Sequence, residues 1–293
     1  MFEGFSDFRI ETEPNVSISG IKAGSGPPLL LLHGYPQTHH IWHLVAPQLT
    51  SEYTVIALDL RGYGASSKPG GSDSHAEYAK SVMARDCQTV MARLGHASYF
   101  VCAHDRGARV AHKLCVDHPA SVRKVITLDI CPTLAMYTKT NQTFATAYFH
   151  WFLLIQKAPF PETLIGQNPR LFAQQFMGSR YAGLKVFNAD ALEQYLKVLE
   201  QPDAIHAMCE DYRASASVDL DEARADLAAG RRIKAPLRAL WGAHGVIEKC
   251  LDALKEWREV SDAEVTGQSV DCGHYIPEEK PDVVLQHIKE FLV

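Results

Sequence analysis

The sequence predicts an α/β fold built on a mostly parallel, doubly wound sheet, and three observations predict it. Short apolar runs alternate with helical stretches towards both ends of the 293-residue chain, and strands that alternate with helices pair in parallel. The runs are apolar at almost every position, which is typical of strands buried on both faces. A long middle stretch without strand-like runs indicates a helical insertion.

Four apolar runs in the first half of the chain are expected to form buried strands. Each is rich in Leu, Val, Ile or aromatic residues and ends at turn-forming residues. Helices are expected at 75–94, where Gly95 stops the pattern, and at 106–118, where Pro119 does so. The expected strands are residues 28–32, 54–60, 98–103 and 124–130.

The alternation stops after the fourth strand. Residues 132–230 are rich in aromatic residues and helix formers, and prolines interrupt them. The pattern then resumes with strands at 237–241 and 264–270 and with helices near 251–260 and at 281–292. We therefore expect a core formed by residues 1–131 and 231–293, with 132–230 as an inserted helical cap. Such a cap would lie over the carboxyl ends of the strands, where these sheets bind ligands.

Composition excludes several classes of protein. The formal net charge is -5, from 29 Lys and Arg against 34 Asp and Glu, and no large basic cluster indicates nucleic acid or membrane binding. The seven cysteines are odd in number, widely spaced and without a C-x-x-C pair, which argues against disulfides and zinc or another metal. We expect reduced, mostly buried thiols. The polar N-terminus and the lack of long apolar runs predict a soluble, cytoplasmic protein.

The strongest chemical motif is Cys-Ala-His-Asp-Arg-Gly at 102–107, where an expected strand runs directly into a helix. Asp105 stands at the corner between small residues, which a strained turn requires. This is the arrangement of a nucleophile elbow, with Asp where lipases and esterases carry Ser. A structural alternative is that Asp105 only caps the helix. Partner groups at the expected points of the chain favour the nucleophile.

Two of these partners follow other expected strands. His-Gly-Tyr-Pro at 33–36 ends the first parallel strand. A loop at this position lends a backbone N–H to an oxyanion hole, so the amides of Tyr35 and Arg106 are the expected donors. Asp-Cys-Gly-His at 271–274 follows the last strand directly, which is where the catalytic histidine of such a fold belongs. His274 is therefore the expected base.

The acid that would orient His274 is not at its usual place. The loop after the strand at 237–241 reads Trp-Gly-Ala-His-Gly, with Gly where Asp is expected. Asp129 is the favoured candidate, because it ends an apolar strand, where a carboxylate without a partner would be costly. It would hold the tautomer of His274 and stabilise the imidazolium. Glu248 is the second candidate.

A carboxylate nucleophile indicates a different reaction from that of a serine. It attacks without prior deprotonation and suits displacement at saturated carbon, which gives an alkyl-enzyme ester. His274 would then activate the water that hydrolyses this ester. Asp105 therefore predicts dehalogenation or epoxide opening rather than ester hydrolysis.

Arg106 and Arg109 predict an anionic substrate. They lie three residues apart, on one face of the helix, at an end where the helix dipole is already positive. Asp105 would offset one of the two cations, which leaves a site for a carboxylate held by paired hydrogen bonds. The alternative is that Arg109 pairs with a surface acid.

On these motifs the sequence resembles the fluoroacetate dehalogenases of the α/β-hydrolase superfamily, over nearly its whole length. The resemblance implies hydrolytic dehalogenation of small 2-halo carboxylates, fluoroacetate or haloacetate, to glycolate and halide, with no cofactor and in a homodimer. The matching segments are residues 33–38 (HGYPQT), 59–64 (DLRGYG), 104–109 (HDRGAR), 128–133 (LDICPT), 148–151 (YFHW), 209–214 (CEDYRA) and 272–274 (CGH).

The resemblance also implies roles for single residues. Asp105 would be the nucleophile, His274 the base and Asp129 its partner, while Arg106 and Arg109 would bind the substrate carboxylate. His150, Trp151 and Tyr212 would bind the halide, because a poor leaving group such as fluoride needs hydrogen-bond donors aimed at its developing charge.

Two features depart from the family. The segment 176–190 is shorter than is typical, and Gly178 falls near a position where a bulky aromatic residue is expected. Both bear on the volume of the pocket and on the preferred halide.

Two further functions compete with this interpretation. An epoxide hydrolase would use the same Asp and His with two tyrosines of the cap, and it would leave Arg106 and Arg109 without a carboxylate to bind. A non-catalytic small-anion binding protein would lack one of the three catalytic groups, and all three have candidates here. A haloalkane dehalogenase is disfavoured because that family carries Trp directly after the nucleophile. The tyrosines available to an epoxide hydrolase are Tyr148, Tyr181, Tyr195 and Tyr212.

Overall fold

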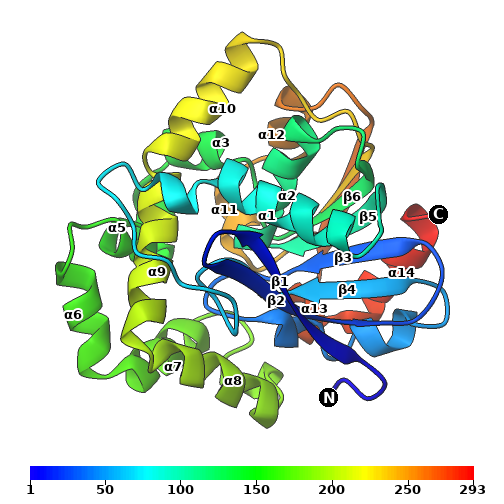
Figure 1. Cartoon of the computed structure of the whole chain (residues 1–293). Helices are drawn as coiled ribbons and strands as arrows, with labels where there is room; N and C mark the ends of the chain where they lie inside the picture. The colour runs from blue at the N-terminus through cyan, green and yellow to red at the C-terminus, as the bar shows by residue number, and fades with distance from the viewer.

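A single eight-stranded sheet organises the protein, in a computed structural model that describes residues 1–293 (Figure 1). The strand order is β1-β2-β4-β3-β5-β6-β7-β8. The six strands from β4 to β8 along this order pair in parallel, while β1 and β2 form an antiparallel edge. The predicted α/β fold with a mostly parallel sheet is confirmed.

The strands β3 to β8 match the strands expected from the sequence, and two further strands were not expected. The edge strands β1 and β2 were not predicted, because β1 is half-exposed and polar residues interrupt its apolar positions. The strands are β1 (Ser6–Glu13), β2 (Val16–Ala23), β3 (Pro28–Leu32), β4 (Thr54–Leu58), β5 (Tyr99–His104), β6 (Val122–Leu128), β7 (Leu237–Gly242) and β8 (Val265–Val270).

Helices cover both faces of the sheet. The predicted helix at 75–94 is divided at Ala79, where the backbone is extended, into the short 3-10 helix η3 and α1. The predicted helix near 251–260 is α12 (Ala253–Glu259), and the short helix α11 (Val246–Cys250) before it was not predicted. The helices outside the middle stretch are η1 (His39–Trp42), η2 (Ala46–Leu49), η3 (Ala76–Tyr78), α1 (Lys80–Arg93), α2 (Arg106–Asp117), α11 (Val246–Cys250), α12 (Ala253–Glu259), α13 (Ile276–Glu279) and α14 (Pro281–Phe291).

The chain between β6 and β7 forms only helices, as the middle stretch of the sequence predicts. In Figure 1 these green and yellow helices stand at the side of the sheet rather than against its faces. They are α3 (Thr133–Thr138), α4 (Gln142–Ala147), α5 (Phe149–Leu154), α6 (Phe160–Gln167), α7 (Pro169–Gly178), η4 (Leu184–Val186), α8 (Ala189–Leu199), α9 (Pro202–Ser215) and α10 (Val218–Ala228). We refer to α3–α10 as the cap helices.

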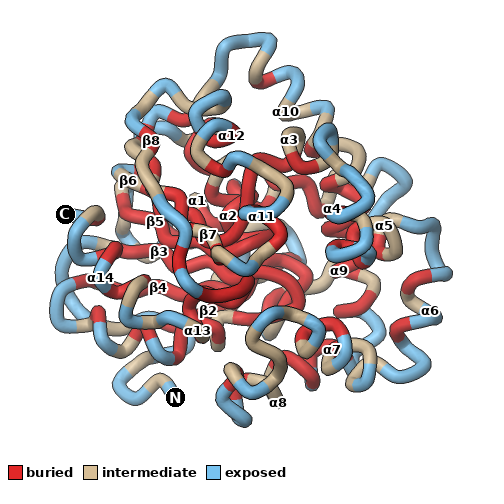
Figure 2. Tube along the Cα trace, turned by 180° about the vertical axis from the view of Figure 1, so that it is seen from behind, coloured by how far each residue is buried: buried red, intermediate tan, exposed pale blue.

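The apolar core explains why the strands read as continuous apolar runs. Leu30 and Leu32 of β3 belong to a cluster of 56 buried residues on one face, while Leu29 and Leu31 belong to a cluster of 23 on the other. Because successive side chains of a strand point to opposite faces, every position of β3 is buried. Figure 2 shows the central strands as the buried interior of the molecule. All seven cysteines are free, and six of them are buried.

No helix in the structure combines the length and the apolar character that crossing a membrane requires.

Candidate active site

Four loops at one edge of the sheet carry the predicted chemical groups. Tyr35 follows β3, Asp105 follows β5, Asp129 follows β6 and His274 lies a few residues after β8. These strands run in parallel, so their carboxyl ends share an edge. The order of the strands reverses between β3 and β5, and crevices at such points are where doubly wound sheets bind ligands.

Asp105 occupies a strained turn between β5 and α2. Its φ of 45° and ψ of -114° lie in a region that residues with a side chain rarely adopt. Glycines on both sides make the turn possible: a Cβ at Gly107 would lie 2.4 Å from the carbonyl oxygen of His33, and one at Gly34 would lie 2.6 Å from Cβ of Asp105. The side chain of Asp105 makes no capping hydrogen bond to α2. Helix capping therefore does not account for this aspartate.

The backbone amide of Tyr35 donates a hydrogen bond of 3.1 Å to Oδ2 of Asp105. This contact orients the carboxylate and leaves Oδ1 as its other nucleophilic oxygen. If Oδ1 formed an ester and water attacked that ester at Cγ, the negative charge would develop on Oδ2. The amide of Tyr35 is a donor already in contact with this oxygen. The structure thus brings the predicted oxyanion donor Tyr35 to Asp105.

Asp129, rather than Glu248, is the acid that meets His274. Nδ1 of His274 lies 2.6 Å from Oδ2 of Asp129, and the amide of Gly242 donates to Oδ1 at 2.8 Å. Glu248 instead accepts a hydrogen bond from the indole of Trp241. An acid at position 242 itself would not fit, because a Cβ there would lie 2.0 Å from the carbonyl oxygen of Gly273. The bond to Asp129 leaves Nε2 of His274 free to act as a base.

The surroundings of Asp105 keep its carboxylate ionised. Burial alone would raise its pKa, but the interaction with His274 and with the cations Arg106 and Arg109 outweighs burial and holds this pKa below its usual value. His104 is neutral, because burial and then repulsion from His274 lower its pKa to about 3. An ionised, buried carboxylate beside a histidine is a competent nucleophile.

The ion-pair partner of Arg106 differs from the sequence prediction, because an acid of the cap helices neutralises this arginine. Its guanidinium donates to both carboxylate oxygens of Asp211, at 2.9 and 2.7 Å, and it lies 4.0 Å over the ring of Tyr212. Asp211, and not Asp105, therefore offsets this cation. Nη1 of Arg106 is the one guanidinium nitrogen that is buried without a hydrogen-bond partner.

Arg109 has no acidic partner at all, so the alternative of a surface ion pair is wrong. Its side chain is buried at 2% exposure and donates to Oγ1 of Thr133 and towards the sulfur of Met136. Its Nε is buried without a partner. Burial, followed by repulsion from Arg106, lowers the pKa of Arg109. A guanidinium remains charged even so, and this one has spare hydrogen-bonding capacity.

The cap helices supply an aromatic wall. His150 and Trp151 lie on α5 and Tyr212 on α9, and all three are buried. The ring centroids of His150 and Tyr212 are 5.7 Å apart, and those of Trp151 and Tyr212 are 6.3 Å apart. Nδ1 of His150 is buried without a hydrogen-bond partner. The three residues predicted to bind the halide therefore lie together in the structure.

These groups are neutral hydrogen-bond donors. Burial, and then the charge of Arg180, lower the pKa of His150 well below its usual value. Burial also raises the pKa of Tyr212 well above its usual value, although Arg106 acts in the opposite direction. A neutral imidazole has one N–H group to donate, and an un-ionised phenol has one O–H group.

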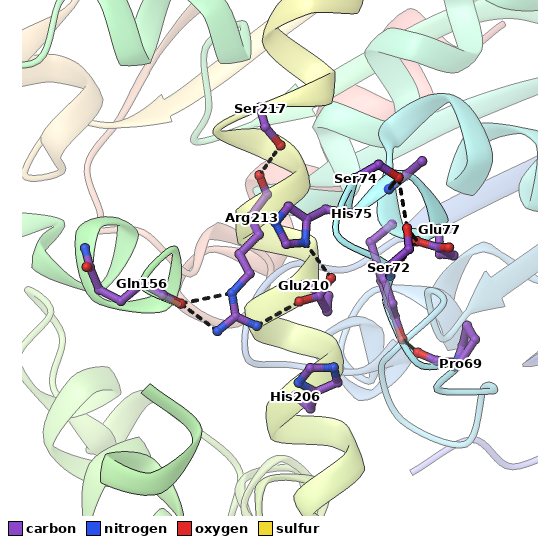
Figure 3. A network of polar contacts seen from close by, with 12 residues as sticks. Pro69, Ser72, Ser74, His75, Glu77, Gln156, His206, Glu210, Arg213 and Ser217 are labelled. Carbon is purple, nitrogen blue, oxygen red and sulfur yellow. Dashed lines mark hydrogen bonds and ion pairs between the residues drawn. The ribbon is translucent and has the colours of Figure 1, made fainter. Parts of the chain in front are cut away.

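A polar network anchors helix α9 to its surroundings (Figure 3). Glu210 bonds to Nδ1 of His75, which lies in the core loop before η3, at 2.8 Å. Arg213 donates to Glu210 at 2.8 Å and to the carbonyl oxygen of Gln156. Contacts from both the core and a neighbouring cap segment thus hold the helix that carries Asp211 and Tyr212.

Three residues of this site were not predicted to take part in it. Phe176 of α7 packs edge-on against His150, with ring centroids 4.5 Å apart. The sequence analysis expected a bulky aromatic residue near Gly178. Phe176, two positions earlier, supplies an aromatic side chain in this part of the cap. Arg180 lies 4.7 Å from the ring of Tyr148 and 4.9 Å from that of Phe176. Asp211, described above, belonged in the sequence analysis to the matching segment 209–214, without a role of its own.

A surface cavity of about 470 Å³ leads to this site between the cap helices and the core. His274 lies among its lining residues, together with Tyr148 and Arg180 of the cap. A small substrate could therefore reach the histidine from this side.

Comparison with known proteins places the chain in a family. The model of the α/β hydrolase fold matches residues 27–281. The chain belongs to the α/β-hydrolase family. A solved structure described as an α/β hydrolase from Nostoc sp. PCC 7120 superposes on this hydrolase with a TM-score of 0.94 at 47% identity, covering 100% of this chain and 99% of that one.

Two relatives of this α/β hydrolase have named activities. A fluoroacetate dehalogenase of Burkholderia sp. is 40% identical over 293 residues, which cover 100% of this chain and 95% of the relative. A soluble epoxide hydrolase of Corynebacterium sp. (strain C12) is 31% identical over 278 residues, which cover 92% of each protein. The predicted resemblance to a fluoroacetate dehalogenase is confirmed, and the chain is an enzyme of the hydrolase class.

Proposed function

We propose that this hydrolase cleaves the carbon–halogen bond of small 2-halo carboxylates, fluoroacetate among them, and releases glycolate and halide. The observation that carries the proposal is the pair of buried arginines beside a buried carboxylate nucleophile. Arg109 has no acid to neutralise it, and a buried guanidinium without an anion is costly. A substrate carboxylate would supply that anion within reach of Asp105.

In the first step, Oδ1 of Asp105 attacks the carbon that bears the halogen. A carbon–oxygen bond forms, the carbon–halogen bond breaks, and the halide leaves with the bonding electron pair. Arg109 and Nη1 of Arg106 hold the substrate carboxylate during this displacement, which fixes the line of attack. The product is an ester between Asp105 and a carboxymethyl group.

The leaving halide would be received by His150, Trp151 and Tyr212. Each can donate a hydrogen bond, and all are buried, where donors stabilise a developing charge more strongly than in water. Fluoride depends on such donors most, because it is the poorest leaving group of the halides. The cap therefore contributes to the chemistry as well as to the enclosure of the site.

In the second step, His274 removes a proton from water, and the resulting hydroxide attacks Cγ of Asp105. Asp129 stabilises the imidazolium that forms, and the amides of Tyr35 and Arg106 stabilise the negative charge on Oδ2. When this intermediate collapses, the imidazolium of His274 gives its proton to the departing oxygen of glycolate, and Asp105 is restored with one oxygen taken from water. The second proton of that water leaves Asp105 for solvent, where it balances the charge of the released halide.

Epoxide hydrolysis is the second candidate, favoured by the position of two tyrosines. Tyr148 lies 6.3 Å from His274 between ring centroids, and Tyr212 is also buried beside the site. Both could protonate the oxygen of an opening epoxide. Tyr195 instead bonds to Glu278, and Tyr181 is 62% exposed. A neutral epoxide would leave Arg109 without an anion, which is why we place this candidate second.

The test is halide release from fluoroacetate, chloroacetate and bromoacetate, with a neutral terminal epoxide as a fourth substrate. Fluoride is followed with an ion-selective electrode, and Asp105→Asn is the matched control. We expect release of fluoride by the wild-type enzyme and none by the variant. Single-turnover reaction in heavy-oxygen water should place the label in the carboxylate of Asp105.

The outcomes separate the candidates. Release of chloride and bromide without fluoride would support the proposed mechanism and show that fluoroacetate is not a substrate. Hydrolysis of the epoxide without any halide release would establish the second candidate instead. If none of the four substrates is turned over, the proposed reaction is wrong.

A further inference from the structure

The cavity that leads to His274 has an unusual charge for this protein. Its thirteen lining residues include Arg180, Lys249, His244 and His274, and none of them is Asp or Glu. The chain as a whole carries a net charge of -5. Three acids border the lining without belonging to it: Asp271 is hydrogen-bonded to His244 at 2.8 Å, Glu279 accepts from the amide of Gly273 at 2.7 Å, and Glu248, next to Lys249 in the sequence, accepts from the indole of Trp241. The fully charged side chains of the lining itself, Arg180 and Lys249, are therefore both cations, on an otherwise acidic molecule.

Arg180 holds the inner position in this cavity. It follows α7, and its guanidinium lies against Tyr148 and Phe176, at 4.7 and 4.9 Å from the two ring centroids. It forms no ion pair, and its Nη1 donates a 3.4 Å hydrogen bond to the carbonyl oxygen of Ala147. Its Nε is buried without a partner. The aromatic contacts hold the side chain in place while its charge remains unneutralised.

Arg180 is also close enough to the site for its charge to act there. Its two aromatic neighbours both touch His150: Phe176 at 4.5 Å and Tyr148 at 5.4 Å between ring centroids. After burial, the charge of Arg180 is the largest influence that lowers the pKa of His150. Arg180 thus lines the cavity and, through these two aromatic side chains, borders the group of residues around His150.

We propose that Arg180, with Lys249 at the rim, gathers carboxylate substrates at the entrance and makes the enzyme selective for anionic over neutral substrates. This inference rests on the proposed function, because it concerns how the 2-halo carboxylate reaches Asp105. A cationic cleft with low-dielectric walls raises the local concentration of an anion and its rate of association. Arg180 takes no part in breaking the carbon–halogen bond, so it is a specificity residue and not a catalytic one.

The role of the charge can be separated from that of the packing. Arg180→Met keeps an apolar chain against Tyr148 and Phe176 but removes the charge, and Arg180→Lys restores a charge. Lys197→Met is the matched control: Lys197 lies on α8 of the cap, is exposed, and does not line the cavity. It makes the same change in net charge at a distant point of the surface.

The experiment measures kcat/KM for chloroacetate over a series of sodium chloride concentrations. For Arg180→Met we expect kcat/KM to fall about 10-fold at low salt through KM, with kcat within about twofold of wild type. The loss should shrink at high salt, because screening weakens the attraction that the wild type uses. Arg180→Lys should recover most of the loss, and Lys197→Met should behave like wild type.

Two results would overturn the inference. One is a loss in Arg180→Met that does not change with salt, or that appears in kcat alone; this would assign Arg180 to packing of the cap. The other is an equal loss in Lys197→Met, which would mean that net charge matters and the entrance does not.

A binding measurement keeps this inference separate from the proposed reaction. In the Asp105→Asn background, which cannot turn over substrate, titration calorimetry with acetate and with neutral acetamide reports recognition alone. Adding Arg180→Met should weaken acetate binding several-fold and leave acetamide binding unchanged. If the wild type releases no halide but this difference is observed, the proposed function fails and the anion-gathering role stands. If acetate binding is unchanged, the role of Arg180 is wrong whatever the reaction.

Discussion

Two groups of buried charges meet at Arg106, and they differ in how completely they are paired. On the cap side, Asp211 bonds to Arg106, to Lys80 and to the phenol of Tyr63, and Asp219 lies 3.4 Å from Lys80. Each cation there faces a carboxylate. On the nucleophile side, Asp105 and Arg109 form no ion pair in the protein. We call these the paired cluster and the open cluster.

The difference shows which charges support the fold and which are left for chemistry. In the paired cluster, Arg106 and Lys80 outweigh the effect of burial and lower the pKa of Asp211 below its usual value. Removing one member would leave the others buried without compensation. In the open cluster the spare hydrogen-bonding capacity is what a substrate would use. Stability should therefore depend on the first cluster and activity on the second.

The largest effect on activity is expected from His274→Gln. This variant keeps the nucleophile and loses the base, so the ester on Asp105 should form and persist, with kcat lower by about 10³- to 10⁴-fold. Mass spectrometry of the intact protein after incubation with chloroacetate should show the added carboxymethyl group. Its absence, with activity lost, would mean that His274 is needed before the ester forms.

Asp211→Asn should have the largest effect on stability. It removes the carboxylate that neutralises Arg106 and Lys80, and breaking a buried ion pair on one side costs about 3–5 kcal/mol. The free energy of unfolding is measured by urea denaturation. The surface pair of Glu193 and Arg170, 2.8 Å apart and partly exposed, provides the control: Glu193→Gln should leave the denaturation midpoint unchanged. Equal midpoints for both variants would contradict the division into clusters.

Glu278 belongs to neither cluster: it is a buried carboxyl group whose hydrogen-bond partners are neutral. Tyr195 donates to it at 2.5 Å and Gln37 at 3.1 Å, and burial raises its pKa to about 8. The unfolded chain ionises this group near its usual pKa of 4.5, so the folded state loses stability as the pH rises from there to about 8. At about 1.4 kcal/mol per pKa unit, the loss is about 3 kcal/mol by neutral pH.

Glu278→Gln should remove this pH dependence. Relative to wild type, the variant gains stability between pH 5 and pH 8, and the two proteins should be most alike near pH 4. Thermal unfolding across this range is the measurement. A constant difference in melting temperature at every pH would show that Glu278 does not titrate in the folded protein.

The smallest effect of the four is expected from Arg109→Met, which tests the open cluster. KM for chloroacetate should rise about 10- to 100-fold, because the substrate carboxylate loses one of its two guanidinium partners. The melting temperature should not fall, since the change removes a buried charge that has no acidic partner. A marked loss of stability instead would mean that Arg109 supports the fold as Asp211 does.

The sequence by itself determined the fold and the main groups of the site. Largely apolar runs predicted β3 to β7, because strands covered on both faces tolerate few polar side chains, whereas the more polar strand β8 was predicted from its place in the alternation of strands and helices. The small residues around Asp105 in the sequence predicted a nucleophile at a strained turn. The structure explains why they are small: a Cβ at Gly107 would collide with the backbone of His33, and one at Gly34 would collide with Asp105. The polar edge strand β1 was missed because half-exposed strands show no such pattern.

Only the tertiary structure decided which charges meet. Arg106 and Asp211 are 105 positions apart in the sequence, and Asp129 and His274 are 145 apart. Nothing local marks Asp211 as the partner of Arg106, or Arg180 as the cation of the entrance. Pairing and burial depend on how the cap helices pack beside the sheet, and that placement follows from the packing of many apolar side chains at once. Local patterns therefore predicted the groups, whereas their electrostatic relations came from long-range packing.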